Sequence, residues 1–312
     1  MKGLAAITIL LIGIAIAVSL SITVLASNPD QTTTTVSVTN APPWIEAKWE
    51  LPDDNTAVPG TQVLPVQNGV KIVRKCVAVC DNNGAVDIIS VIGRTYYPDT
   101  TLKELETLHI ATTAEFTECQ VEIYDPEFIN KPGVCELYVG NINMQYYDPA
   151  GNYTVEVIAG DSGGLQNPPD PPAKNQFEYL ELVALELDTT LVDFGSIAPG
   201  TTSQVLGDAD MITASAPTIK NAGNVPIDLD PIIATDLTTA VGASIANDNL
   251  ATGFQTSFFD VFLGADASPF AKYDLNLTLT GLNLENFQLA VPLATAPGAY
   301  TGSVTLTAVK SV

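Results

Sequence analysis

Apolar residues follow two patterns along this chain, one continuous and one broken into short runs. Residues 4–26 form the run LAAITILLIGIAIAVSLSITVLA, and no charged residue occurs between Lys2 and Asp30. As a helix, this run would extend ~35 Å, enough to cross a hydrocarbon core of ~30 Å. In the rest of the chain, short apolar runs alternate with Gly, Pro, Asn and Asp, which is typical of strands joined by turns.

The N-terminal run has three alternative fates. As an uncleaved signal-anchor it would leave the N-terminus in the cytoplasm, because Lys2 precedes it and Asp30 follows it. Cleavage after Ala26 would instead release a soluble protein. Finally, Lys2-Gly3 directly before the run resembles the type III signal of archaeal pilins and archaellins, which implies cleavage after the glycine and packing of the helix into a filament. Thr8 stands where bacterial pilins commonly have glutamate.

Several runs in the first half of the chain predict strands. Val70–Cys80 is extended and ends at the turn 81–84, Asp-Asn-Asn-Gly. Val86–Tyr97 is rich in β-branched and aromatic residues, and Asn152–Ala159 alternates apolar with polar positions.

One segment of the first half predicts a helix. Within Leu102–Ile123, the residues Leu102, Leu105 and Leu108 have helical spacing. We interpret this segment as a small helical insertion between strands.

The second half reads as a series of short strands with almost no helical period. Turns are indicated by Pro199-Gly200, by residues 222–224 and by Pro297-Gly298. About eight strands at this spacing favour a β-sandwich. The predicted strands are Leu180–Leu187, Leu191–Phe194, Pro217–Lys220, Val225–Leu229, Phe258–Leu263, Tyr273–Thr280, Phe287–Val291 and Tyr300–Ala308.

The predicted fold class is therefore all-β, with two immunoglobulin-like β-sandwich domains after the N-terminal helix. Two segments without an apolar period serve as spacers, and the prolines of the second favour a semi-rigid polyproline II rod. The predicted domains are 1–27, a signal or transmembrane helix; 28–44, a Thr/Pro-rich spacer; 45–165, a sandwich with disulfides; 166–176, a Pro-rich linker; and 177–312, a second sandwich.

The two halves end with a similar motif. Residues 151–154, Gly-Asn-Tyr-Thr, and residues 298–301, Gly-Ala-Tyr-Thr, each lead into a predicted strand. A glycine turn before a strand whose first inward residue is tyrosine resembles the tyrosine corner of immunoglobulin-type sandwiches.

Five segments resemble archaeal surface proteins, which are anchored proteins with repeated immunoglobulin-like sandwiches. The last three also resemble bacterial surface domains of the WxL or camelysin type, although no Trp-x-Leu motif occurs in the C-terminal half. The resemblance implies display or assembly at a cell surface and transfers no catalytic residue. The segments are CDNNGAVDI (80–88), YYDPAGNYTVEV (146–157), DFGSIAPGTT (193–202), PTIKNAGNVPIDLD (217–230) and APGAYTGSVTLTA (296–308).

Four cysteines, Cys76, Cys80, Cys119 and Cys135, lie in the first predicted sandwich. Outside the cytoplasm an even number predicts disulfides, and their spacing does not form zinc knuckles. If Cys76 and Cys80 lie on one extended strand, their Cα atoms are ~13 Å apart, too far for a bond, and both would reach into residues 102–136. A turn beginning at Cys80 would allow the local pair instead, so the pairing stays open.

The sequence contains no recognisable catalytic motif. His109 is the sole histidine, and nothing around it resembles a nucleophile elbow; we interpret it as a structural or surface residue. Walker A, HExxH and Rossmann motifs are absent. We therefore predict that the protein is not an enzyme.

One loop has the oxygen-rich composition of a cation site. Asp81, Asn83 and Asp87 surround a glycine turn, and carboxylate and amide oxygens are ligands for calcium. The spacing lacks the EF-hand pattern, and Asp and Asn also make turns without an ion. Calcium is the one cofactor that the sequence suggests.

The charge is strongly acidic, −23 from 35 Asp+Glu against 12 Lys+Arg, and is spread over both halves. Such a chain repels phosphate backbones, so a nucleic-acid partner is not expected. Expected partners are the membrane, through the N-terminal helix, and a further copy, a surface protein or a glycan. Asn152 and Asn276 lie in glycosylation sequons.

These features predict an extracellular, membrane-anchored structural or adhesive surface protein with a single N-terminal pass. The first alternative is a pilin-like filament subunit that assembles through its N-terminal helix. The second alternative is a secreted carbohydrate-binding module or hydrolase.

Overall fold

The computed structural model describes residues 35–122, 133–168, 174–256, 259–263 and 270–312. Residues 41–312 form one compact unit, while residues 1–40 belong to another. Within the described ranges there is no helix with the length and apolar character needed to span a bilayer. The apolar run 4–26, with the predictions made for it, lies outside the described residues.

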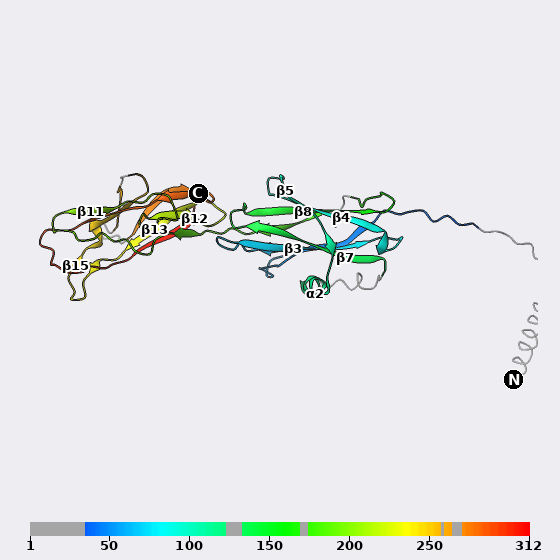
Figure 1. Cartoon of the computed structure of the whole chain (residues 1–312), viewed down its shortest axis with the longest axis horizontal. Coiled ribbons are helices and arrows are strands. Elements are labelled where there is room, and N and C mark those ends of the chain that lie inside the picture. Colours follow the sequence, from blue (N-terminus) through cyan, green and yellow to red (C-terminus); the bar gives the residue numbers. More distant parts are fainter. Residues whose placement is uncertain (1–34, 123–132, 169–173, 257–258, 264–269) are drawn as a thin grey trace, which may run out of the picture. The chain divides into compact units, whose positions relative to one another are not determined.

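The strands fall into two groups that share no sheet (Figure 1). We call the group within residues 44–179 the first sandwich and the group within residues 185–310 the second sandwich. The all-β prediction is confirmed at this level, since strands far outnumber helices in the described chain.

The first sandwich consists of two sheets. The first sheet has the order β1-β3-β7-β6 and the second the order β2-β9-β8-β4-β5, and all pairs except the parallel β2–β9 are antiparallel. The bounds are β1 Trp44–Leu51, β2 Gln62–Val63, β3 Val70–Cys80, β4 Ile88–Tyr96, β5 Leu102–Thr107, β6 His109–Ile110, β7 Cys135–Gln145, β8 Gly151–Asp161 and β9 Lys174–Tyr179, with a 3-10 turn η1 at Ala85–Asp87.

Alternation of side chains along β3 explains how the sheets pack. Val73, Val77 and Val79 point toward the second sheet and are fully buried there. Cys76 points to the opposite face, where it packs with Trp49 and other apolar residues. Both faces of this sheet are therefore covered, the inner face by the second sheet and the outer face by the short helix α2, Thr113–Glu122 (Figure 1).

The predicted helix over Leu102–Ile123 was wrong for its first half. Residues 102–107 form the edge strand β5, paired with β4, where Leu102 and Leu105 are exposed. The helix begins only after Thr112, whose amide and hydroxyl both donate to the Glu115 carboxylate. This capping box satisfies free amides at the start of α2, whereas β5 is held by its neighbouring strand.

The second sandwich is built from smaller sheets. Their orders are β10-β12-β19, β11-β20-β16-β17, β18-β13-β21 and β14-β15. The bounds are β10 Leu185–Leu187, β11 Thr202–Val205, β12 Thr218–Asn221, β13 Ile227–Ala234, β14 Leu237–Thr238, β15 Ser244–Ile245, β16 Leu250–Gly253, β17 Val261–Phe262, β18 Phe270–Leu277, β19 Leu282–Leu284, β20 Asn286–Ala290 and β21 Val304–Lys310, with a 3-10 turn η2 at Asn247–Asn249.

A large apolar cluster holds the second sandwich together. It joins Ile219 of β12, Leu229 and Ile232 of β13, Leu250 of β16 and Leu289 of β20. The strand predicted at Leu191–Phe194 is absent, because this segment pairs with no neighbouring strand, whereas the unpredicted β11 and β16 do pair.

The structure also corrects a predicted boundary. Residues 174–176 belong to the predicted Pro-rich linker, but in the structure they begin β9, which pairs with β8 across Gly151–Glu156. The start of the second sandwich therefore lies after Tyr179 and not at residue 177.

Candidate functional site

The four cysteines form two disulfides, Cys76–Cys119 and Cys80–Cys135. Both Cys76 and Cys80 lie on β3, so the alternative of a local bond between them does not occur. Cys119 lies on α2 and Cys135 begins β7, which confirms that both bonds reach into residues 102–136. The first bond fixes α2 to the outer face of the sheet, and the second joins β3 to β7 at the Cys80–Cys135 pair of their register.

Beyond the end of β3, three aspartates converge. Carboxylate oxygens of Asp81, Asp87 and Asp161 lie within 4.8 Å of one another. Asp81 follows β3, Asp87 ends η1 and Asp161 ends β8, so the two sheets bring them together. Asp81 and Asp161 are buried, while Asp87 is partly exposed.

The contacts of Asp81 leave one of its oxygens available. Its Oδ1 accepts a hydrogen bond of 2.7 Å from the Asn83 amide. Its Oδ2 is buried and has no hydrogen-bond partner within the described chain. A buried carboxylate oxygen without a donor is costly, and a cation is one group that would satisfy it.

The predicted calcium set is therefore brought together only in part. Asp81 and Asp87 meet, but the Asn83 side-chain oxygen instead accepts from the Ala41 amide at 2.9 Å. Asp161, which the sequence analysis missed, takes the third place. The sequence feature that could have indicated Asp161 is a second Asp- and Gly-rich turn, at residues 161–164, which resembles the turn at 81–84 only in composition.

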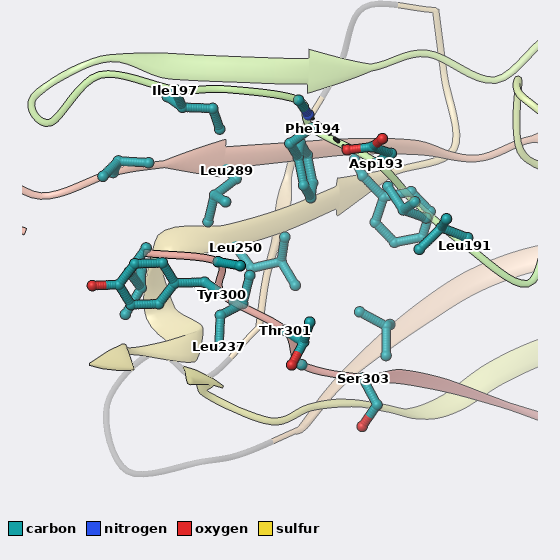
Figure 2. A pocket seen from close by; sticks show the side chains of 18 of the residues that line it. Leu191, Asp193, Phe194, Ile197, Leu237, Leu250, Leu289, Tyr300, Thr301 and Ser303 are labelled. Atoms are coloured by element: carbon teal, nitrogen blue, oxygen red, sulfur yellow. Dashed lines mark hydrogen bonds between the residues drawn. The ribbon is translucent and has the colours of Figure 1, made fainter. Parts of the chain in front are cut away.

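An apolar groove is the second candidate site. It has a volume of about 1010 Å³ and opens in the second sandwich, between residues 191–197 and residues 299–304 (Figure 2). Leu237, Leu250 and Leu289 form its floor and belong to the core of this sandwich. β21, whose Val304 and Leu306 line the groove, is the end strand of its sheet.

Few charged groups line the groove. Asp193 is the one charged residue among those that line it, and its Oδ1 accepts from the Gly195 amide at 2.8 Å. The Tyr300 hydroxyl donates to the Ala296 carbonyl. This mainly apolar lining suits an uncharged apolar ligand.

The remaining predicted site residues lie on the surface. His109 is exposed on β6, with its Nε2 3.2 Å from Glu115, in agreement with a surface role. Asn152 and Asn276 are also exposed. Glycosylation at these two residues stays a prediction.

No family model matches this sequence, nor does any curated protein. Among solved structures, a Niemann–Pick type C2 protein from the Japanese carpenter ant is 8% identical, with 47% of this chain and 99% of that chain covered and a TM-score of 0.25. The C-terminal domain of the AgI/II polypeptide BspA from Streptococcus agalactiae is 10% identical, with 87% and 98% covered and a TM-score of 0.23.

The sialic acid binding region of a Streptococcus sanguinis adhesin is 12% identical, with 88% of this chain and 76% of that chain covered and a TM-score of 0.24. With TM-scores and identities this low, these similarities assign neither a fold family nor a function. The resemblance to archaeal surface proteins stays a prediction.

Proposed function

We propose that this chain is an extracellular structural or adhesive surface protein built from immunoglobulin-like sandwiches and without catalytic activity. The observation that carries the proposal is the pair of disulfides in the first sandwich, with no free cysteine in the described chain. Disulfides persist in oxidising spaces and are rare in the cytosol. Anchoring by residues 4–26 would keep the sandwiches at the cell surface.

Tyrosine hydroxyls support the immunoglobulin-like part of the proposal. Tyr153 donates to the Pro149 carbonyl and Tyr300 to the Ala296 carbonyl, each at 2.8 Å and each four residues upstream. This is the hydrogen bond expected of a tyrosine corner, and it occurs once in each sandwich.

Surface display is tested on intact cells. Protease added outside should degrade the chain, and the cysteines should react with a membrane-impermeant maleimide only after reduction. Protection from protease on intact cells, together with cysteines that react without reduction once the cells are lysed, would contradict the proposal. Specific turnover of a glycan or peptide by the purified chain would contradict its non-catalytic part.

We further propose that Asp81, Asp87 and Asp161 hold a calcium ion. Calcium–oxygen distances are ~2.3–2.6 Å, so oxygens around one ion lie up to ~5 Å apart, which agrees with the 4.8 Å cluster. Bound calcium would neutralise carboxylates from both sheets and so tie the ends of β3 and β8 together.

Thermal unfolding tests the calcium proposal. Millimolar calcium should raise the melting temperature of the first sandwich relative to EDTA, and Asp81→Asn should remove the difference. Asp99→Asn, at an exposed loop carboxylate, is the matched control and should keep it. Equal melting temperatures with calcium and with EDTA would overturn the proposal.

A further inference from the structure

Three side chains with complementary chemistry meet between the two sheets of the first sandwich. Lys48 and Glu50 lie on β1, in one sheet, and Asn175 lies on β9, in the other. Because Lys48 and Glu50 are two residues apart on a strand, both side chains point inward. The side chain of Lys48 is 0% exposed and that of Glu50 is 1% exposed.

Their polar atoms are in direct contact. Lys48 Nζ donates to the Val155 carbonyl at 2.6 Å and to Asn175 Oδ1. Asn175 Nδ2 donates to Glu50 Oε2 at 2.7 Å, and Lys48 Nζ lies 3.6 Å from Glu50 Oε1. Because the Lys48 amine contacts Oδ1 of the Asn175 carboxamide, it also lies next to the carbonyl carbon Cγ. The Glu50 carboxyl group contacts the other end of the same carboxamide, the nitrogen Nδ2.

Burial sets the protonation states that such chemistry needs. Burial lowers the pKa of Lys48 to about 8, although the neighbouring Glu50 opposes this. Burial likewise raises the pKa of Glu50 above its usual value. Both changes favour an uncharged amine with a free lone pair beside a protonated carboxyl group.

We propose that Lys48 and Asn175 are joined by an intramolecular isopeptide bond, with Glu50 as the catalytic residue. The amine nitrogen of Lys48 attacks Asn175 Cγ, and Glu50 polarises the carboxamide. Glu50 then moves a proton from the attacking nitrogen to the departing Nδ2. The bond from Cγ to Nδ2 breaks, ammonia leaves, and one amide replaces another, so no oxidant or activated co-reactant is needed.

The surface of the protein offers a natural contrast. Lys220 Nζ donates to Asn68 Oδ1 at 3.0 Å and to Glu186 Oε2 at 3.1 Å, and Asn68 Nδ2 donates to the same carboxylate at 2.8 Å. These are the same three residue types, but Asn68 is exposed. Partial burial lowers the pKa of Lys220, yet Glu186 and Tyr146 outweigh it and leave this pKa raised. The protonated amine has no lone pair, so this set does not react.

The bond would tie the first long strand of the sandwich to its last. Lys48 and Asn175 are 127 residues apart in sequence and belong to opposite sheets. A pulling force that enters near Trp44 and leaves near Tyr179 would then pass through the bond, and the intervening strands would not be peeled apart. This purpose rests on the proposed surface role, but the bond itself does not.

Peptide mapping of the purified full chain, reduced and alkylated, tests the bond. We expect no tryptic cleavage after Lys48 and a branched peptide that joins Lys48 to Asn175, lighter by one ammonia than its two linear parts. Recovery of cleaved, linear peptides with free Lys48 and unmodified Asn175 would overturn the proposal, whatever the protein's function.

Variants separate the roles of the three residues. Glu50→Gln keeps the size of the side chain and should lose most of the branched peptide, while Lys48→Met should lose all of it. Lys220→Met, in the exposed set, should keep it fully. The Cys80–Cys135 disulfide, mapped in the same digest, reports whether each variant has folded. A folded Glu50→Gln variant with undiminished branched peptide would overturn the catalytic role of Glu50.

Discussion

The two sandwiches are stabilised in different ways. The first has a polar layer inside it: Lys48, Glu50 and Lys75 are buried, and Lys75 lies 2.6 Å from Glu106 of the opposite sheet. This layer separates two apolar clusters, and disulfides cover the outer face. The second has no cysteine, and among its described residues it has one continuous apolar cluster and an open groove.

The difference shows how disulfides can offset the stability that a core loses when a polar layer divides it. Burying charges costs free energy even when they are paired, so the polar layer adds less stability than an apolar core of the same volume. Covalent bonds offset this because they restrict the unfolded chain. The second sandwich has a continuous apolar core and contains no disulfide.

The largest expected effect on this comparison comes from reducing both disulfides. Each bond should contribute about 2–5 kcal/mol to the unfolding free energy of the first sandwich. Differential scanning calorimetry with and without a reductant should show one transition move to lower temperature and the other stay in place. A single transition that moves as a whole would show that the two sandwiches unfold together.

A buried carboxyl group should give the second sandwich its own pH dependence. Burial raises the pKa of Glu285 to about 8, with the nearby Asp188 adding to the rise and a hydrogen bond from Thr252 opposing it. The folded state keeps the proton that the unfolded state loses above pH ~4.5, so stability falls as pH rises toward 8. We expect a loss on the order of 3 kcal/mol between pH 4.5 and pH 7.

Glu285→Gln checks this effect. The variant should be more stable than the parent at pH 8 and should lose the pH dependence in the second transition alone. Glu186→Gln, at a partly exposed carboxylate, is the control and should retain it. A parent protein whose second transition is flat between pH 5 and pH 8 would contradict the expected protonation.

The smallest effect should distinguish the two tyrosine corners. Tyr153 is fully buried, whereas Tyr300 is partly exposed. Tyr153→Phe leaves the Pro149 carbonyl without a buried donor and should cost about 1–2 kcal/mol, while water can replace the hydroxyl in Tyr300→Phe, which should cost about 0.5 kcal/mol. Chemical denaturation of each variant measures both values; equal costs would show that burial does not separate the two corners.

The long strands were predictable because their pattern is local. Val70–Cys80 has the predicted bounds in the structure, and β8 extends the predicted Asn152–Ala159 by two residues or fewer at each end. The predictions failed where pairing with a neighbouring strand determines the secondary structure. Leu102–Thr107 has helical spacing but pairs with β4, and Leu191–Phe194 has strand composition but no pairing partner.

The sites required contacts that no local pattern contains. Asp81 and Asp87 are close in sequence and could be proposed together, but Asp161 reaches them only through the sheet that joins β8 to β4. The Lys48–Glu50–Asn175 cluster had no signal at all, since its members come from the two ends of the first sandwich.

The amino-acid sequence alone determined the all-β class, the number of cysteines, the acidic charge and the tyrosine motif at the end of each sandwich. These depend on composition and on spacing over a few residues. Only the tertiary structure decided the disulfide pairing, the third aspartate and the buried Lys48–Glu50–Asn175 cluster. The physical reason is that burial and distance between opposite sheets, which set protonation and reactivity, arise only when residues far apart in the sequence pack together, from 43 positions in one disulfide to 127 in the Lys48–Asn175 contact.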